Sequence, residues 1–217
     1  MNRFTLLLLT LPLGACATDG FDIPSFPSVA SLFDSTYPEV ERLDQPPRPV
    51  MQPSLDKVGS MTVTSLVDGE RNTYAVSRYH NGVRVRESDG CVWTSAPNWF
   101  APSDSWANCG DSLNWSTASA QVRELDPLYP LQIGSVGRYE RKAVSHTGRT
   151  YTRETRCEVI DAVSVLRPGK AATPAFVVEC KDPRRTRTTW YAPDEGPIAY
   201  RETHRRNGVQ EAWLRTN

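Results

Sequence analysis

The sequence predicts an all-β protein, built as an antiparallel meander sheet or a partly closed barrel of about ten strands. Three observations support this prediction. Apolar and polar residues alternate in short runs, most clearly over 83–86, as in a strand with one buried face. Asn-Gly pairs at 81–82 and 207–208 lie between such runs and are strong hairpin signals. The chain of 217 residues holds six Trp and eight Tyr but only three Met, which suits strands better than helices.

The first sixteen residues have the three parts of a secretory signal. Arg3 supplies a positive charge, residues 4–13 form an apolar run, and two small residues precede Cys16. The run is too short to span a bilayer as a helix. The order Leu13-Gly14-Ala15-Cys16 closely resembles the lipobox of bacterial lipoproteins. The alternative is a plain secretory signal with a coincidental Cys16.

This resemblance implies that residues 1–15 are a signal peptide that is removed, and that Cys16 becomes the new N-terminus. Cys16 would then carry a diacylglycerol and a further fatty acyl chain such as palmitate, so that the lipid bilayer is a partner. Two or three chains anchor a protein firmly, because each buried methylene contributes about 0.8 kcal/mol. An Asp directly after the acylated Cys often means retention in the inner membrane. Ala17 stands there, so the resemblance implies the periplasmic face of the outer membrane.

Residues 16–56 are expected to form a lipidated, proline-rich tether ahead of a β-rich globular domain at 57–217. The prolines recur too often for a helix or a ladder of strands. We therefore expect a semi-extended segment. These prolines are Pro24, Pro27, Pro38, Pro46, Pro47, Pro49 and Pro53.

The domain alternates between strands and tight turns. Turn residues such as Asp68-Gly69 and Asp182-Pro183 separate runs with a period of two. The expected strands are 61–67, 73–80, 83–91, 138–144, 150–160, 175–180, 185–192, 198–205 and 209–215.

Four cysteines, Cys91, Cys109, Cys157 and Cys180, remain once Cys16 is assigned to the lipid. An even number in an oxidising compartment favours two disulfides, and four cysteines allow three pairings. We expect Cys91–Cys109 and Cys157–Cys180, because each pair brackets one local segment, and each bridge should contribute about 3 kcal/mol. A zinc site is the alternative. The sequence has neither a Cys-x-x-Cys pair nor a His at ligand spacing, so no metal is expected.

The segment 91–115 is a long loop rich in aromatic residues, which the Cys91–Cys109 bridge would largely close. Indole faces stack on sugar rings or apolar ligands, so the loop is a candidate binding platform. The alternative, which we favour, is a structural cluster that holds the loop on the sheet. The aromatic residues are Trp93, Trp99, Phe100, Trp106 and Trp115.

Residues 116–123 are the only stretch with helical character. The run that follows contains Pro130-Leu131-Gln132-Ile133-Gly134. Its Pro-Leu-x-x-Gly pattern resembles the start of the β-sheet in several uncharacterised bacterial envelope lipoproteins. This resemblance implies a β-sheet domain and no particular activity.

Arginines crowd two of the predicted turns near the C-terminus. If both turns lie at one end of the sheet, they form a cationic rim that could meet an anionic polymer or an acidic protein. The alternative is a solvated face balanced by Asp194, Glu195 and Glu202. The arginines are Arg184, Arg185, Arg187, Arg205 and Arg206.

No catalytic motif is evident. The chain lacks a Gly-x-Ser-x-Gly elbow, its three histidines lie near predicted turns, and Asp104 and Asp111 are assigned to the loop. The formal net charge of zero gives no reason to expect nucleic acid as a partner. We therefore expect a non-enzymatic envelope binding or assembly module without a cofactor, whose partner is an envelope protein or a glycan. A hydrolase or glycan-processing enzyme using the aromatic loop, and a structural subunit of an envelope complex, are the alternatives.

Overall fold

The computed structural model describes residues 35–52, 59–80, 82–96, 98–110 and 114–217. The signal segment and Cys16 lie outside these residues. Within them the chain forms thirteen strands and no helix. The strands are β1 (Val40–Arg42), β2 (Ser60–Ser65), β3 (Arg71–Tyr79), β4 (Gly82–Glu87), β5 (Val92–Ser95), β6 (Ser105–Ala107), β7 (Ala118–Asp126), β8 (Val136–Ser145), β9 (Thr150–Val165), β10 (Thr173–Lys181), β11 (Arg185–Ala192), β12 (Gly196–His204) and β13 (Gly208–Arg215).

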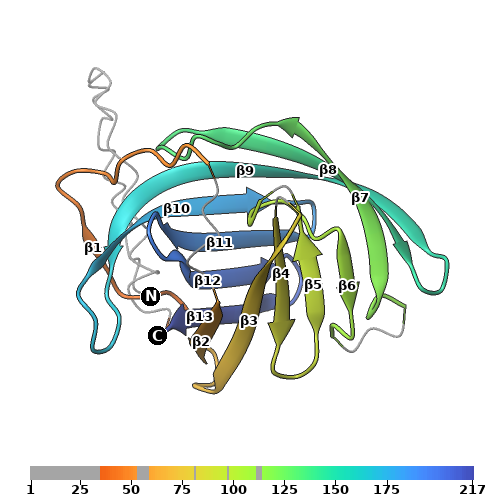
Figure 1. Cartoon of the computed structure of the whole chain (residues 1–217), viewed down its shortest axis with the longest axis horizontal. Coiled ribbons are helices and arrows are strands. Elements are labelled where there is room, and N and C mark those ends of the chain that lie inside the picture. The colour runs from red at the N-terminus through yellow and green to blue at the C-terminus, as the bar shows by residue number, and fades with distance from the viewer. Residues whose placement is uncertain (1–34, 53–58, 81, 97, 111–113) are drawn as a thin grey trace, which may run out of the picture. The chain divides into compact units, whose positions relative to one another are not determined.

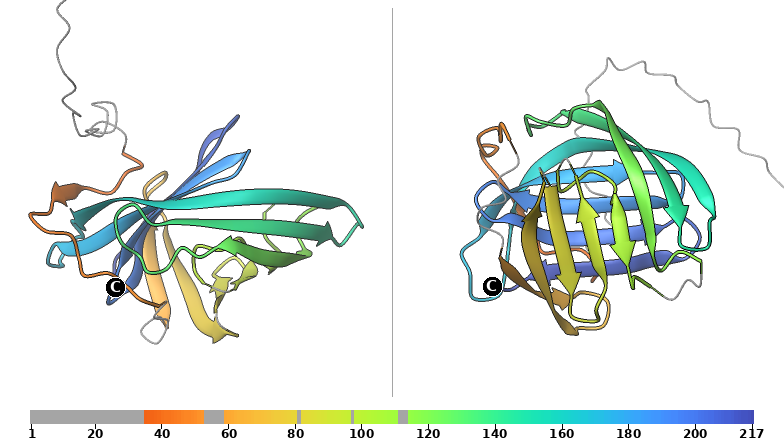
Figure 2. Two further views of the ribbon diagram at one scale, coloured as in Figure 1. Left: turned by 90° about the horizontal axis from the view of Figure 1, so that it is seen from above. Right: turned by 45° about the vertical axis from the view of Figure 1, so that its right-hand side comes forward.

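Strands β2 to β13 close into an antiparallel barrel of twelve strands (Figure 1). The barrel has twelve strand pairings. Eleven of them follow the order β9-β10-β11-β12-β13-β2-β3-β4-β5-β6-β7-β8, and the pairing of β8 with β9 closes the ring. Strand β9 is long enough to pair with β8 over its first part and with β1 at Val163–Val165. Figure 2 shows β7, β8 and β9 side by side from above. The predicted all-β antiparallel fold is confirmed.

The predicted helical character of 116–123 is wrong, because this segment contributes to β7. Ala118, Ala120 and Val122 are buried or half-buried, whereas Ser119 and Gln121 between them are exposed. This is a period of two, and pairing with β8 along the whole strand outweighs the weak helix preference of Ala and Gln. The expected count of about ten strands also omitted β1, β5 and β6, of which β5 and β6 lie within the aromatic loop.

The barrel interior at one end, which we call the closed half, is a packed apolar core. Inward side chains of Met61, Val83, Tyr139, Phe176 and Tyr191 are among those with almost no exposed surface. Gly82 also belongs to the packed region, since an added Cβ would lie 1.7 Å from the carbonyl oxygen of Ser95. Burial on this scale provides the main stabilisation of the barrel.

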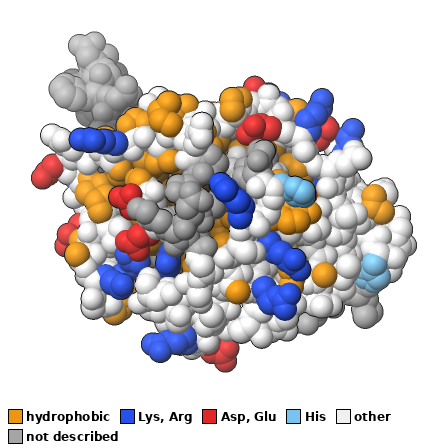
Figure 3. Space-filling model, viewed as in Figure 1, with side chains coloured by type: hydrophobic (Ala, Val, Ile, Leu, Met, Phe, Trp, Pro, Cys, Tyr) orange, Lys and Arg blue, Asp and Glu red, His pale blue; other side chains and the backbone are white. Residues whose placement is uncertain are grey.

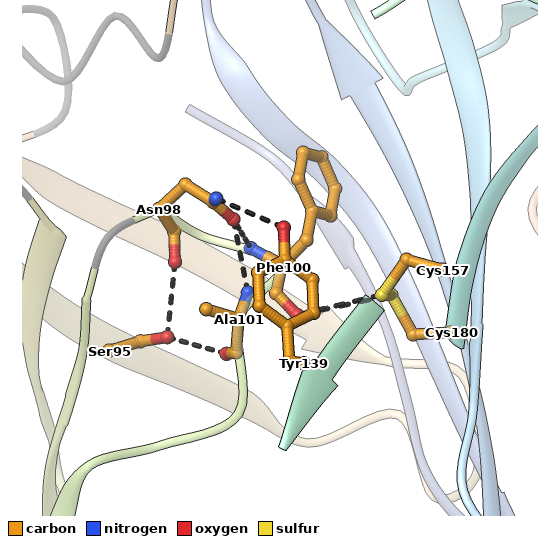
Figure 4. The surroundings of a disulfide bond; sticks show 7 residues. All are labelled: Ser95, Asn98, Phe100, Ala101, Tyr139, Cys157 and Cys180. Atoms are coloured by element: carbon orange, nitrogen blue, oxygen red, sulfur yellow. Dashed lines mark hydrogen bonds between the residues drawn. A yellow bond between two sulfur atoms is a disulfide. The ribbon is translucent and has the colours of Figure 1, made fainter. Parts of the chain in front are cut away.

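Residues 98–104, between β5 and β6, fold into the barrel and form a plug. The Asn98 side chain accepts from the backbone N–H groups of Phe100 and Ala101, both at 3.0 Å, and donates to the Tyr139 hydroxyl at 3.1 Å (Figure 4). The ring of Phe100 packs 5.3 Å from that of Tyr191. These contacts satisfy the polar groups that the plug brings into the core.

Both expected disulfides are present, Cys91–Cys109 and Cys157–Cys180. The first joins the chain before β5 to the chain after β6. In the second, the two cysteines are direct partners across β9 and β10, and their sulfurs lie 3.8 and 3.9 Å from the carbonyl oxygen of Phe100 (Figure 4). The second bridge therefore lies against the plug.

Residues that the sequence assigns to the tether also lie against the barrel. Tyr37 packs edge-on against Trp190 on the outer face, with ring centroids 6.1 Å apart. The guanidinium of Arg201 lies 4.3 Å from the Tyr37 ring, and Val50 bridges to Leu131. Tyr37 thus covers part of the outer surface of β10 to β13, whereas Val50 packs against the core cluster that contains Leu131.

Candidate functional site

The other end of the barrel interior, which we call the open half, contains a cavity of about 1150 Å³. The plug residues Trp99, Phe100 and Ala101 form part of its wall, and turn residues including Gly148, Arg149 and Arg184 lie near its mouth. This volume is slightly above the usual range for small-molecule sites, roughly 300 to 1000 Å³. The cavity is therefore the candidate functional site.

The side chains around the cavity are mostly aromatic or charged. No Val, Leu, Ile or Met occurs among the described residues that line it. Nine aromatic residues do: Tyr74, Trp93, Trp99, Phe100, Trp106, Trp115, Tyr151, Tyr200 and Trp213.

The strand register explains how charged groups from distant parts of the sequence meet. Cys157, Cys180, Arg187, Glu202 and Glu211 are direct partners in turn across β9 to β13. Directly paired residues lie on the same face of a sheet. Since the disulfide faces inward, the register also brings Arg187, Glu202 and Glu211 to the interior.

One side of the cavity, which we call the arginine wall, comprises Arg141 on β8, Arg153 on β9 and Arg187 on β11. Arg141 and Arg153 are direct partners across β8 and β9. Asp182 is the nearby counter-charge, 3.5 Å from Arg153, and its side chain also accepts the backbone N–H groups of Arg184 and Arg185. Like charges placed directly opposite each other destabilise a sheet, so this pairing has a cost.

The guanidinium of Arg141 lies among aromatic rings, 5.4 Å from the ring centre of Trp106 and 5.3 Å from that of Tyr151. Its Nε is buried and has no hydrogen-bond partner among the described residues. Burial, with contributions from the charges of Arg187 and Arg153, lowers the pKa of Arg141 to about 10. Arg141 stays charged at neutral pH, and the rings offset part of its lost hydration.

A second group of residues, which we call the carboxylate wall, adjoins the arginine wall at Glu202, which is the direct partner of Arg187 across β11 and β12 and forms an ion pair with Arg185 at 2.8 Å. This wall comprises Glu87, Glu202 and Glu211. Each accepts a hydrogen bond from an aromatic side chain. Trp93 Nε1 donates to Glu87 at 2.9 Å, the Tyr200 hydroxyl to Glu202 at 3.1 Å, and Trp213 Nε1 to Glu211 at 2.9 Å. The carboxylates are thereby held in place along the wall.

Burial raises the pKa of two of these carboxyl groups. The pKa of Glu211 rises to about 7, chiefly through burial and then through the charges of Glu87 and Glu202. Hydrogen bonds from Tyr74 and Trp213 oppose this rise. Burial also raises the pKa of Glu87. The charge of the carboxylate wall therefore changes near neutral pH.

The structure separates the five predicted aromatic residues of the 91–115 loop. Trp99 and Phe100 are buried in the plug, which fits the structural interpretation. Trp93, Trp106 and Trp115 are half-buried and line the cavity, which fits the binding interpretation. The Trp106 and Trp115 rings stack with centroids 6.4 Å apart, and Trp115 lies 4.8 Å from Tyr151. All five residues border the cavity, and the two from the plug are also buried.

The predicted arginine turns lie at the same end of the barrel. The backbone N–H of Arg205 donates to the carbonyl of Arg184 at 2.8 Å, so the two turns are adjacent. Arg184 and Arg185 line the cavity near its mouth, Arg205 and Arg206 are exposed, and Arg187 is part of the arginine wall. Figure 3 shows Lys and Arg side chains spread over one face of the molecule instead of gathered in one patch.

Sequence reasoning missed Arg141, Arg153, Glu87 and Glu211, and it named Glu202 only as a charge that balances the arginine turns. The sequence did contain a signal for the two arginines. Arg141 lies on the same face of its strand as Tyr139 and Ala143. Arg153 lies on the same face of its strand as Tyr151 and Thr155. A charged residue on an otherwise buried face indicates either a paired charge or a site.

The described part of the chain holds no cluster of three His, Cys, Asp or Glu side chains able to bind a metal ion. Asp104 accepts a hydrogen bond from the Thr94 hydroxyl, and Asp111 lies outside the described residues. Among the described residues, no helix is long and apolar enough to cross a membrane. Comparisons of the chain with protein-family models, curated proteins and solved structures find no match.

Proposed function

We propose that the protein is a lipid-anchored lipoprotein of the outer membrane that binds a small ligand inside its barrel, without catalysing a reaction. The observation that carries the binding proposal is the cavity of about 1150 Å³ with its aromatic and charged walls. Plug, disulfides and closed sheet hold these walls in place before any ligand arrives. Preorganisation of this kind lowers the entropic cost of binding.

The lipid anchor is proposed from the Leu13-Gly14-Ala15-Cys16 motif and from the two disulfides. Disulfides form and persist in oxidising compartments such as the bacterial periplasm. An acyl anchor at Cys16 would keep the barrel in that compartment at the membrane surface. A binding module there needs no substrate turnover to be useful.

Intact-mass analysis of the protein from its native host tests the anchor. A chain that starts at Cys16 and carries diacylglycerol and acyl mass supports the proposal, and Cys16→Ser should abolish the added mass. An unprocessed chain, or a trimmed chain without lipid, would contradict the anchor and leave the binding proposal standing.

Intrinsic fluorescence tests ligand binding, because five of the six tryptophans line the cavity. We expect a fraction of the host's periplasmic small molecules to change the emission saturably. Trp106→Phe and Trp115→Phe should reduce the change. The matched control is Trp190→Phe, on the outer face, which should leave the change intact. A response that is unaffected by both cavity variants, or no response to any fraction, would contradict a ligand site in the barrel.

A further inference from the structure

We infer that the ligand is a small anion built on a ring, namely a sugar or an aromatic ring that carries a phosphate or carboxylate group. The anionic group would lie against Arg141, Arg153 and Arg187, and the ring against Trp106, Trp115 and Tyr151. This inference rests on the proposed function and adds the chemical class of the ligand.

The first argument is charge. Three guanidinium groups face this side of the cavity, and two carboxylates lie beside them: Asp182 pairs with Arg153, and Glu202 is the direct cross-strand partner of Arg187. Arg187 has no hydrogen bond or ion pair to a side chain that the structure describes, and the buried Nε of Arg141 has no partner there. Buried cations are normally paired. An anionic group of a ligand would supply the missing partner through charge-assisted hydrogen bonds.

The second argument is the register. Arg141 and Arg153 are direct partners across β8 and β9, an arrangement that costs stability while the cavity is empty. Two guanidinium groups that converge from adjacent strands can donate several N–H groups to one phosphate or carboxylate. The repulsion between Arg141 and Arg153 in the free protein would thus be relieved when an anion binds between them.

The third argument is the chemistry of the remaining wall. Branched aliphatic side chains and Met are absent from the described lining, so the cavity offers little surface suited to a flexible acyl chain. Trp106 and Trp115 are stacked at 25°, and Tyr151 lies beside them. Flat aromatic surfaces are suited to stacking on rings. The wall therefore favours a sugar or aromatic ring over a lipid tail.

Charged residues at the mouth of the cavity and inside it favour one orientation of an anionic ligand. Arg149 and Arg184 lie near the mouth and would attract an anion, whereas Arg185 is already paired with Glu202. Further from the arginine wall, Glu211 on β13 repels an anion but can accept hydrogen bonds from ligand hydroxyl groups. The ligand would therefore bind with its anionic group toward β8 and β9 and its hydroxyl or neutral end toward β12 and β13.

Isothermal titration calorimetry of the full-length protein tests this inference with defined probes. The aromatic pair is 1-naphthyl phosphate and 1-naphthol, the sugar pair is glucose-1-phosphate and glucose, and octyl phosphate and inorganic phosphate serve as comparisons. We expect one ring phosphate to bind at least about tenfold more tightly than its neutral partner and than octyl phosphate. The ring phosphate that binds more tightly shows whether the ring of the ligand is aromatic or a sugar.

Arg141→Met should weaken binding of that ring phosphate at least about tenfold, because it removes the buried charge and keeps a side chain of similar length. Arg187→Met provides a second variant in case the first alters the fold. Arg123→Met is the matched control, since Arg123 is exposed on β7 and pairs with Glu140. It should leave the affinity unchanged.

Equal affinity for the neutral and the phosphorylated ring would overturn the anionic part of the inference. Tighter binding of octyl phosphate would overturn the ring part. Failure of all these probes, while a host fraction still changes the cavity tryptophan emission, would overturn the ligand class and leave the proposed function intact. Failure of both experiments would overturn the proposed function as well.

Discussion

The closed and open halves of the barrel interior use the same strands for different purposes. On β8, Tyr139 packs in the closed half, and Arg141, two residues further along the same face, lines the cavity. On β11, Tyr191 packs against Phe100, whereas Arg187 lines the cavity. The barrel thus changes from apolar core to charged site within two to four residues of a strand.

This difference shows how a small barrel can contain buried charged side chains that lower its stability. In the closed half, inward side chains exclude water and stabilise the fold. In the open half, three buried or half-buried arginines and three glutamates reduce stability, since burial without full pairing is unfavourable. The plug lies between the two environments, because Trp99, Phe100 and Ala101 pack in the core and also border the cavity. Removing an apolar side chain from the closed half should therefore destabilise the fold, whereas removing a buried charge from the open half should stabilise it.

The largest effect is expected in the closed half. Phe100→Ala should reduce the free energy of unfolding by about 3 to 5 kcal/mol, because it leaves a void beside the rings of Tyr191 and Tyr129. Urea denaturation followed by circular dichroism measures it. The comparison is Trp115→Ala in the open half, which should cost markedly less. Equal losses would contradict a division between core and site.

The next effect concerns the bridge beside the cavity. The double variant Cys91→Ser/Cys109→Ser should lose about 3 kcal/mol, since the bridge closes a loop with a sequence separation of 18. Denaturant midpoints of the variant and the oxidised parent measure this loss. The reduced parent protein should show a loss at least as large, because it also lacks Cys157–Cys180. A variant as stable as the oxidised parent would show that strand pairing alone holds β5 and β6.

A substitution in the carboxylate wall should increase stability in a way that depends on pH. The pKa of Glu211 is raised to about 7 in the fold, above its ordinary 4.5. Below about pH 4.5 the carboxyl is protonated in both states and contributes nothing. As the pH rises from about 4.5 to about 7, the unfolded chain ionises while the folded carboxyl keeps its proton, so the fold loses stability, and the loss is complete above about pH 7.

Glu211→Gln should therefore gain about 1 to 3 kcal/mol at pH 8 and change little at pH 4.5. The amide oxygen can still accept from Tyr74 and Trp213. Thermal unfolding between pH 4.5 and 8 measures the difference, with the exposed Glu41→Gln as the control. A gain of the same size at every pH would show that the substitution acts through packing and not through charge.

The smallest effect is expected in the arginine wall. Arg141→Met should raise the free energy of unfolding by about 1 kcal/mol or less. Relief of burial and of repulsion from Arg153 and Arg187 outweighs the lost contacts with Trp106 and Tyr151. Chemical denaturation without ligand measures the gain. A clear loss of stability would mean that Arg141 supports the fold and is not retained for a ligand.

Local patterns in the sequence were enough to predict much of the barrel. The period of two marked most of the strands, and the bracketing of local segments by cysteines predicted both disulfides correctly. Those features depend on residues close together in the chain, where pleat geometry and short loops restrict the possibilities. The helical prediction over 116–123 failed because pairing with β8 outweighs a weak local preference.

The site itself required the tertiary structure. Arg141, Arg153, Arg187 and Glu211 come from four strands, and they meet because closure and register bring one face of each strand to the same interior. A shift of one residue in any of these strands would turn its charged group outward. Sequence periodicity gives the face of a strand, but only the pairing of distant strands shows which faces enclose a cavity. The aromatic loop illustrates this limit, because one segment supplies both buried plug residues and cavity residues.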